Sequence, residues 1–166
     1  IPEKKGKTEY ELNKFDDLVE QINTALMRGQ KTLIYFPTVA LINRFWAYCG
    51  TKAIGEYVSR YHGQLDALEK NEAFEKFRNG QTPIMLATKA FGMGIDVPDI
   101  AVVIHFAPTG NVCDYMQEIG RAARTTDVEG HAVYHHMRND FKHINRLHGL
   151  STICPYQLVE VIKKVL

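Results

Sequence analysis

Residues 111–124, with the sequence NVCDYMQEIGRAAR, carry side chains suited to binding an anion. A continuous α-helix here would place Gln117, Arg121 and Arg124 within roughly a 60° arc, opposite a broad apolar face. No carboxylate at i,i+4 spacing pairs with these arginines, and Gly120 leaves the backbone bare beside them. Such guanidinium groups favour contact with a phosphate, although an ordinary solvated helix face has a similar composition.

A second stretch, LATKAFGMGIDVP at residues 86–98, joins a buried strand to two glycines and an acid. Gly92 and Gly94 allow a close backbone approach to a ligand or a positive φ. Asp96, two residues further on, is placed to accept hydrogen bonds from sugar hydroxyls. A lone GxG is more often an ordinary turn. It is the position of this motif at the end of a strand that favours a ligand-binding loop.

Short apolar runs predict the strands that position these residues. Nearly continuous runs of this kind are typical of strands buried on both faces of a parallel sheet. The clear ones occupy residues 31–36, 82–87 and 101–106, and the weaker ones residues 57–62 and 132–135. The alternating segment 7–13 (KTEYELN) predicts a further, edge strand.

Helical patterns lie between these strands. Apolar positions at helical spacing, each closed by a glycine, predict helices over residues 16–28, 38–49 and 66–79. This alternation predicts an α/β fold, a three-layer α/β/α sandwich with a mainly parallel sheet of about six strands. In such a sheet the ligand site lies at the carboxyl ends of the strands.

The sequence ATKAFGMGID, followed by YMQEIGRAAR, resembles motifs V and VI of superfamily 2 helicases, and RecQ-like DNA helicases most of all. TLIYFPTVA resembles motif IV, and YHGQLD with FEKFRNGQ resembles motif IVa. The resemblance extends from about Lys7 to Tyr134, and the combination of spacings is highly specific. It implies the second RecA-like lobe, the helicase C-terminal lobe, of an ATP-dependent helicase.

The resemblance also implies a role for individual residues of motifs V and VI. Arg124 is similar to the arginine finger that reaches the γ-phosphate of ATP, with Arg121 its companion and Gln117 part of the same contact. The residues similar to those of motif V that approach the nucleotide are Gly92, Gly94 and Asp96.

Four further residues fall where such helicases contact the nucleic-acid backbone, namely Thr38, His62, Gly63 and Thr88. Hydroxyl groups commonly contact phosphates, but Thr38 is equally suited to cap the helix that follows it. For His62 the alternative is a core histidine with satisfied hydrogen bonds. The partner implied is single-stranded or forked DNA, with RNA possible.

Three departures from the RecQ pattern bear on these expectations. Ala123 stands where RecQ proteins commonly have the second glycine of GRAGRDG. Motif V reads GMGID rather than GMGIN, as in several RNA-dependent relatives, so an RNA-directed lobe is an alternative. RecQ proteins usually continue with a four-cysteine zinc module, and only Cys154 lies in that region.

The remaining parts of a helicase motor are missing from the sequence. The single GK[ST] match, Gly6-Lys7-Thr8, follows no strand and has Ile1 where a P-loop has its first glycine. We therefore expect ATP to be bound mainly by a first lobe of the same parent chain, which also holds Mg²⁺, and this chain to be inactive alone. The other alternative is a non-catalytic module that binds nucleic acid or a protein partner.

The composition excludes several other classes of protein. Among the 166 residues, 45% are hydrophobic and 23% are charged, which is typical of a globular domain and not of a disordered or fibrous chain. Lys+Arg 20 against Asp+Glu 19 gives a net charge of +1, so nucleic acid would be held by individually placed residues and not by a basic tail. No apolar run approaches the ~20 residues of a membrane span.

Cysteines and histidines indicate neither a disulfide framework nor a metal site. The three cysteines form no CxxC pair, which favours a reducing, intracellular location, cytoplasmic or with the nucleic acid of a nucleoid or nucleus. Five of the seven histidines crowd into residues 131–148. On a strand, however, His131 and His135 would lie ~13 Å apart, too far to share one ion.

We expect residues 1–149 to form the lobe, and residues 150–166 to form a linker and an amphipathic helix that begins near Pro155. The chain begins with Ile1-Pro2, without a methionine or a signal-peptide pattern, which indicates a piece of a longer protein.

Overall fold

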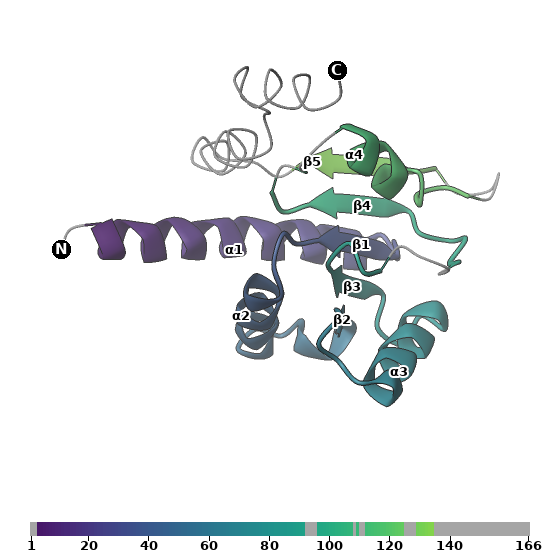
Figure 1. Cartoon of the computed structure of the whole chain (residues 1–166), viewed down its shortest axis with the longest axis horizontal. Helices are drawn as coiled ribbons and strands as arrows, with labels where there is room; N and C mark the ends of the chain where they lie inside the picture. The colour runs from purple at the N-terminus through teal and green to yellow at the C-terminus, as the bar shows by residue number, and fades with distance from the viewer. Residues whose placement is uncertain (1–2, 92–95, 108, 110–111, 125–128, 135–166) are drawn as a thin grey trace, which may run out of the picture.

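Helices and strands alternate along the chain (Figure 1). The computed structural model describes residues 3–91, 96–107, 109, 112–124 and 129–134. Its elements are α1 (Glu3–Met27), β1 (Thr32–Tyr35), α2 (Val39–Gly50), the 3₁₀ turn η1 (Gly55–Tyr57), β2 (Val58–Tyr61), α3 (Ala67–Arg78), β3 (Ile84–Ala87), β4 (Val102–His105), α4 (Val112–Ile119) and β5 (His131–Tyr134).

The five described strands form one parallel sheet in the order β2-β3-β1-β4-β5. Their pairing register aligns the last residue of every strand, in the order Tyr61, Ala87, Tyr35, His105 and Tyr134. The loops that follow therefore leave the sheet from one common edge, which we call the carboxyl edge. The predicted α/β class with a parallel sheet is confirmed.

Helices pack on both faces of the sheet, with α2 and α3 on opposite sides (Figure 1). On one face, Phe15 of α1 and Phe45 of α2 belong to a single buried cluster. On the other face, Phe77 of α3 belongs to a second cluster. Strand β1 contributes Ile34 to the first cluster and Leu33 to the second, as expected for a strand buried on both sides.

Helices α2 and α3 begin at the caps that their sequences predict. Thr38 caps α2, and its Oγ1 accepts a hydrogen bond from the Leu41 N–H at 3.3 Å. Asp66 and Glu69 form the reciprocal capping box of α3, with hydrogen bonds of 2.8 and 3.1 Å. Beyond α3, Gly80 has a φ of +76°, which a glycine adopts without steric cost.

The edge strand predicted at residues 7–13 is wrong, because this segment belongs to α1. The described sheet accordingly has five strands and not about six. Glu, Lys and Leu in this segment are strong helix formers, and the helix continues directly into the amphipathic pattern around Phe15. The Glu11 carboxylate also accepts a hydrogen bond from Arg44 Nε of α2 at 2.7 Å, which holds α1 against α2. None of the described helices is long and apolar enough to cross a membrane.

Candidate functional site

Four of the predicted site residues lie in loops at the carboxyl edge of the sheet. His62 and Gly63 follow β2, Thr88 follows β3, and Thr38 lies at the start of α2, just after β1. The Thr88 N–H donates to the Tyr61 carbonyl at 3.4 Å, which connects the loops after β2 and β3. Because β3 also neighbours β1, the sheet brings all four residues onto adjacent loops.

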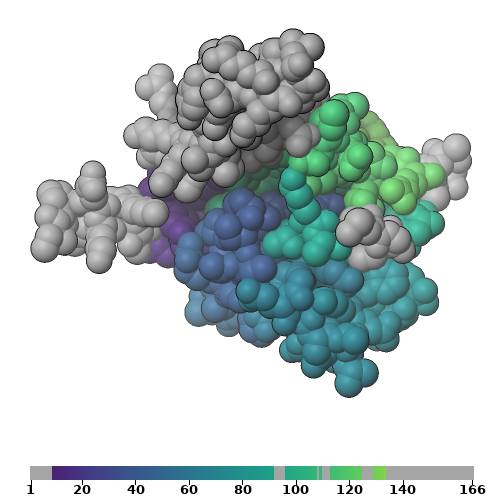
Figure 2. Space-filling view, in the orientation of Figure 1, coloured from purple at the N-terminus to yellow at the C-terminus, as the bar shows by residue number. Residues whose placement is uncertain are grey.

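Two ion pairs connect the loop after β3 to α4 and the segment behind it. Lys89 pairs with Asp114 in the first turn of α4. Further on, Asp96 Oδ1 accepts a hydrogen bond from Arg124 Nη1 at 2.9 Å, and Arg124 Nε donates to the Gly120 carbonyl at 3.3 Å. In Figure 2 the teal surface of the loop after β3 lies beside the green surface of α4 and the residues that follow it.

The prediction of one helix through to Arg124 is wrong. Helix α4 ends at Ile119, and Arg121 and Arg124 follow in a turn. Gly120 is a poor helix former, and beyond it Ala123 takes a left-handed φ of +51°, which a helix cannot contain. The two arginines are therefore positioned by a turn and its tertiary contacts and not by a helical face.

The expectation that no carboxylate pairs with these arginines is also wrong for Arg124. Its partner, Asp96, comes from the other motif, and i,i+4 spacing along one segment does not reveal it. Arg121 is half-buried, and the two arginines line a small crevice together with Phe91, Val97 and Ile100. Gln117 is exposed on α4, and no hydrogen bond among the described residues joins its side chain to either arginine.

A buried polar network, absent from the sequence predictions, lies next to this turn. His105 Nε2 is 2.8 Å from Glu118 Oε2 of α4, and the Tyr35 ring stacks on the His105 ring with 5.5 Å between centroids. The Tyr35 hydroxyl donates to the Phe91 carbonyl at 3.4 Å. Burial raises the pKa of Tyr35 to about 12, and the nearby positive charge of Arg121 acts in the opposite direction. In sequence, Tyr35 and His105 are indistinguishable from ordinary core positions at strand ends.

His62 is buried, with 3% of its surface exposed. Within the described part of the chain neither ring nitrogen has a hydrogen-bond partner. Burial lowers the pKa of His62, and the positive charge of Arg60 lowers it further. The ring is therefore held in its neutral form at the carboxyl edge.

The other loop residues make local contacts that leave room for a ligand. Thr88 Oγ1 accepts from the Ala90 N–H at 3.4 Å, and this hydroxyl, like that of Thr38, still has a proton to donate. Gly63 is exposed with open space around its α-carbon, and its carbonyl accepts from Lys70 Nζ at 3.3 Å. This bond brings a cation to the loop after β2.

Several predicted features lie outside the described residues. These are Gly92 and Gly94 of motif V, Cys154, four of the clustered histidines, and the boundary between residues 149 and 150. The fifth histidine, His131, is exposed at the start of β5. Among the described residues, no group of three or more His, Cys, Asp or Glu side chains is arranged to hold a metal ion.

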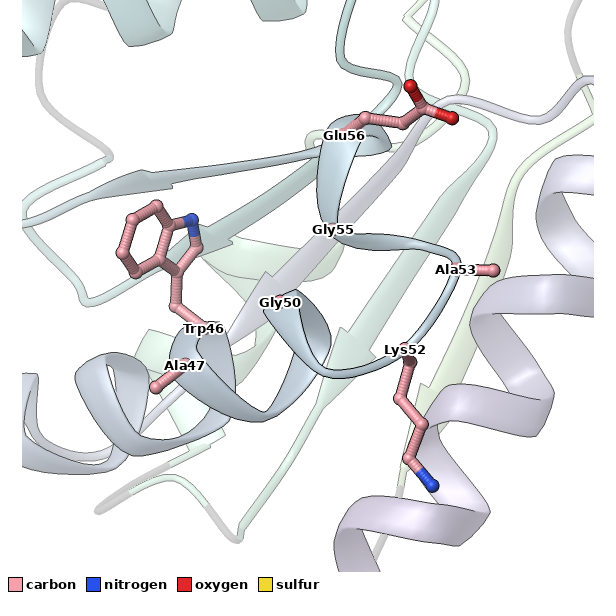
Figure 3. A pocket seen from close by; sticks show the side chains of 7 residues that line it. All are labelled: Trp46, Ala47, Gly50, Lys52, Ala53, Gly55 and Glu56. Carbon is pink, nitrogen blue, oxygen red and sulfur yellow. The ribbon is translucent and has the colours of Figure 1, made fainter.

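A separate hollow lies between the last turn of α2 and η1 (Figure 3). It is lined by small residues together with Trp46, Lys52 and Glu56. Because η1 leads into the amino end of β2, this hollow lies away from the carboxyl edge, and none of the predicted site residues lines it.

Comparison with known families decides what kind of domain carries this site. Residues 13–126 match the family described as the helicase conserved C-terminal domain. The chain belongs to this helicase C-terminal domain family. The resemblance to superfamily 2 helicases is thereby confirmed.

Proteins with sequences similar to this helicase C-terminal domain are themselves helicases. The ATP-dependent helicase wrn-1 of Caenorhabditis elegans is 38% identical over 96 residues, which are 58% of this chain and 9% of that protein. The ATP-dependent DNA helicase Q1 of Pongo abelii is 28% identical over 155 residues, which are 89% of this chain and 22% of that protein. The ATP-dependent RNA helicase DBP2 of Saccharomyces cerevisiae is 35% identical over 115 residues, which are 69% of this chain and 21% of that protein. The chain thus spans between 9% and 22% of the length of these relatives.

Solved structures confirm the RecA-like fold of this helicase C-terminal domain. The C-terminal domain of the DEAD-box protein Dbp5 has a TM-score of 0.64 at 24% identity, covering 92% of this chain and 91% of that one. S. cerevisiae Dbp5 bound to RNA and ADP BeF3 has a TM-score of 0.68 at 26% identity, covering 94% and 43%.

Proposed function

We propose that this domain is the C-terminal motor lobe of an ATP-dependent nucleic-acid helicase, to which it supplies Arg124 as an arginine finger. The observation that carries the proposal is the 2.9 Å ion pair between Arg124 and Asp96. These two residues, 28 positions apart, belong to the two motifs in which the resemblance implies nucleotide contacts. Their pairing brings motifs V and VI together, which supports a shared role at a nucleotide.

The arginines act on the charge that develops during phosphoryl transfer. ATP and Mg²⁺ are held mainly by a first lobe of the parent chain, and Arg124 and Arg121 neutralise charge on the γ-phosphate across the interlobe cleft. Such arginine contacts contribute ~10³–10⁵ in rate in nucleotide hydrolases. The chain alone lacks the phosphate-binding loop, so the proposal includes its inactivity in isolation.

Asp96 holds Arg124 in the absence of nucleotide. The side chains of Arg124 and Asp96 are 37% and 77% exposed, and ion pairs in such surroundings contribute only ~0–1 kcal/mol. Arg124 therefore exchanges this carboxylate for a phosphate at little cost. The exchange leaves Asp96 available to accept from ribose hydroxyls.

The loops after β1, β2 and β3 contact the nucleic-acid backbone in this proposal. The hydroxyls of Thr38 and Thr88 donate to phosphate oxygens, and the open surface at Gly63 admits the strand beside His62. The partner is single-stranded or forked DNA, as the similarity to helicase Q1 supports. A helicase acts where its nucleic acid is, so the proposal places the parent inside the cell.

RNA is the second candidate substrate, for a specific reason. Motif V reads GMGID, and the chain is similar both to the RNA helicase DBP2 and to Dbp5 solved with RNA. Comparing stimulation of the parent's ATP hydrolysis by single-stranded DNA and by RNA separates the two candidates. Stimulation by RNA alone would replace DNA as the substrate and leave the motor assignment intact.

The test of the motor assignment is ATP hydrolysis by the parent protein, with and without nucleic acid. We expect Arg124→Ala to lower nucleic-acid-stimulated turnover by about 10³-fold or more while the melting temperature stays the same. Arg44→Ala is the matched control, because Arg44 pairs with Glu11 far from motifs V and VI. Retained turnover in Arg124→Ala would refute the role of Arg124 as an arginine finger. A wild-type parent that binds nucleic acid but does not hydrolyse ATP would favour a non-catalytic module.

A further inference from the structure

A buried polar pair holds helix α4 against the sheet. Nε2 of His105, the last residue of β4, lies 2.8 Å from Oε2 of Glu118 in the last turn of α4. Only 1% of the His105 side chain and 10% of the Glu118 side chain are exposed. The His105 ring also contacts Tyr115, about one turn earlier on α4, with 4.9 Å between ring centroids. Two residues of α4 thus contact the same residue of the sheet.

The segment that carries both arginines begins at this pair. Residues 120–124, which we call the arginine turn, directly follow α4 and contain Arg121 and Arg124. The Arg121 N–H donates to the Glu118 carbonyl at 3.3 Å. The residue whose side chain contacts His105 therefore also holds the backbone of Arg121.

A second contact fixes the other side of the arginine turn. The Ala123 N–H donates to the Ile100 carbonyl at 2.9 Å, in the loop that leads into β4. Arg121 therefore lies between two attachments, one to the last residue of β4 and one to the loop before this strand. The first is made by a side chain and the second by the main chain, so a substitution at Glu118 removes the first alone.

Stability of the fold does not by itself require a polar pair at this position. Taking a carboxylate and an imidazole out of water costs free energy that their contact must offset, and apolar side chains of similar volume often serve a buried site equally well. A hydrogen bond differs from apolar packing because it is directional. The pair therefore specifies one position of the last turn of α4 along β4, whereas apolar packing tolerates a shift.

We infer that Glu118 is a positioning residue, whose contact with His105 fixes the arginine turn for phosphoryl transfer. Because its side chain is buried, Glu118 acts through the arginines that follow it and not by touching the nucleotide. The inference rests on the proposed function, which gives these arginines a role that depends on accurate placement. Displacing a catalytic group by about 1 Å can lower a rate by about 100-fold.

The test is the variant Glu118→Leu in the parent protein, assayed for nucleic-acid-stimulated ATP hydrolysis. Loss of the contact should lower kcat by about tenfold or more, with KM for ATP unchanged within about twofold, because the arginines act in the transition state. Glu118→Gln should retain kcat within about twofold, since an amide can hydrogen-bond to either tautomer of His105. A purely structural role would change the melting temperature but would not produce this split between kcat and KM.

Thr82→Val is the matched control. It also removes one partner of a buried side-chain hydrogen bond, the 2.7 Å contact between Thr82 and Ser59, but it does so just before β3, away from α4. We expect this variant to lose stability and to keep its kcat. The inference would be overturned by an unchanged kcat in Glu118→Leu, by a rise in KM alone, or by an equal loss of kcat in Thr82→Val.

A double variant keeps the test decisive if Glu118→Leu does not fold. His105→Phe combined with Glu118→Leu replaces both partners by apolar side chains, which often preserves stability, and it keeps a ring against Tyr35 and Tyr115. We expect the same loss of kcat, and a wild-type kcat in this variant would overturn the inference. Failure of the proposed function is distinct, because it appears as absent turnover in the wild-type parent or as undiminished turnover in Arg124→Ala.

Discussion

His62 lies in an environment that its sequence does not reveal. Its ring is almost fully buried at the carboxyl end of β2, and neither ring nitrogen is hydrogen-bonded within the described residues. Burial and the positive charge of Arg60 lower its pKa, Lys70 acts in the same direction, and Glu69 opposes them. The neutral ring packs in the fold, and protonation there would place a charge among buried atoms.

This environment predicts a pH dependence of stability. Because the pKa of His62 is lower in the folded chain than its ordinary 6.5, the unfolded chain takes up a proton first as the pH falls. The contribution of His62 to the free energy of unfolding should be complete above about pH 6.5 and should decline as the pH falls from there through the folded pKa. Urea unfolding at about pH 7.5 and at about pH 5.5 measures this effect. We expect the free energy of unfolding to fall less between these two pH values for His62→Leu than for the wild type. Equal losses in the two proteins would contradict this expectation.

The turn after α4 is the element that sets the place of both arginines. Ala123 adopts a φ of +51° within it, where RecQ proteins commonly have a glycine. Its N–H donates to the Ile100 carbonyl at 2.9 Å, which attaches the turn to the loop before β4. A Cβ added at Gly130 would lie 2.8 Å from the Ala123 Cβ, so Gly130 makes room for the alanine.

Two substitutions in this turn should be coupled. Ala123→Gly removes the left-handed strain of an alanine but adds freedom to the unfolded chain, so we expect a gain of at most about 1 kcal/mol. Gly130→Ala should destabilise the wild type by about 1–3 kcal/mol through overpacking. Combined with Ala123→Gly, the cost should fall, because the nearest clashing Cβ is gone. Urea unfolding of the four proteins measures the coupling, and strictly additive effects would argue against the contact.

At the scale of the whole molecule, an aromatic cluster joins α1, α2 and the sheet. Phe45 is fully buried, and its ring centroid lies 5.0 Å from that of Phe15 and 5.5 Å from that of Phe36. Phe36 stacks in turn on Phe106, at 4.7 Å. The two residues that directly follow β1 and β4 are thus anchored in the core, which fixes where the loops of the carboxyl edge begin.

Neighbouring residues of α2 should therefore differ sharply in their effect on stability. Phe45→Ala leaves a cavity in this cluster and should cost about 3–5 kcal/mol in the free energy of unfolding. Trp46→Ala removes a larger side chain that is 42% exposed and stacked on Arg60, and should cost about 1 kcal/mol. Chemical denaturation of both variants checks the contrast. Similar costs would mean that the cluster does not anchor the sheet as described.

Local pattern was sufficient for most of the fold. Apolar runs bounded by turns predict β1, β3 and β4, because a strand buried on both faces must be apolar throughout. Weaker runs predict β2 and β5, the outer strands of the described sheet. Caps such as Asp66 and Thr38 locate the starts of α3 and α2, since each cap contacts only the first turn of its own helix. The segment 7–13 was mistaken for a strand because a short alternating pattern carries no information about the helix that continues from it.

Local patterns along the chain predict the α/β class, the five described strands, the capped helices and the motifs in which the site residues lie. Only the folded arrangement shows that Asp96 pairs with Arg124, that His62 is buried without a hydrogen-bond partner among the described residues, and that the Tyr35 hydroxyl donates to the Phe91 carbonyl. The difference arises from how far along the chain each kind of interaction reaches. Propensity and periodicity act over a few residues, whereas these contacts join segments 28 or more positions apart, or depend on packing from every side.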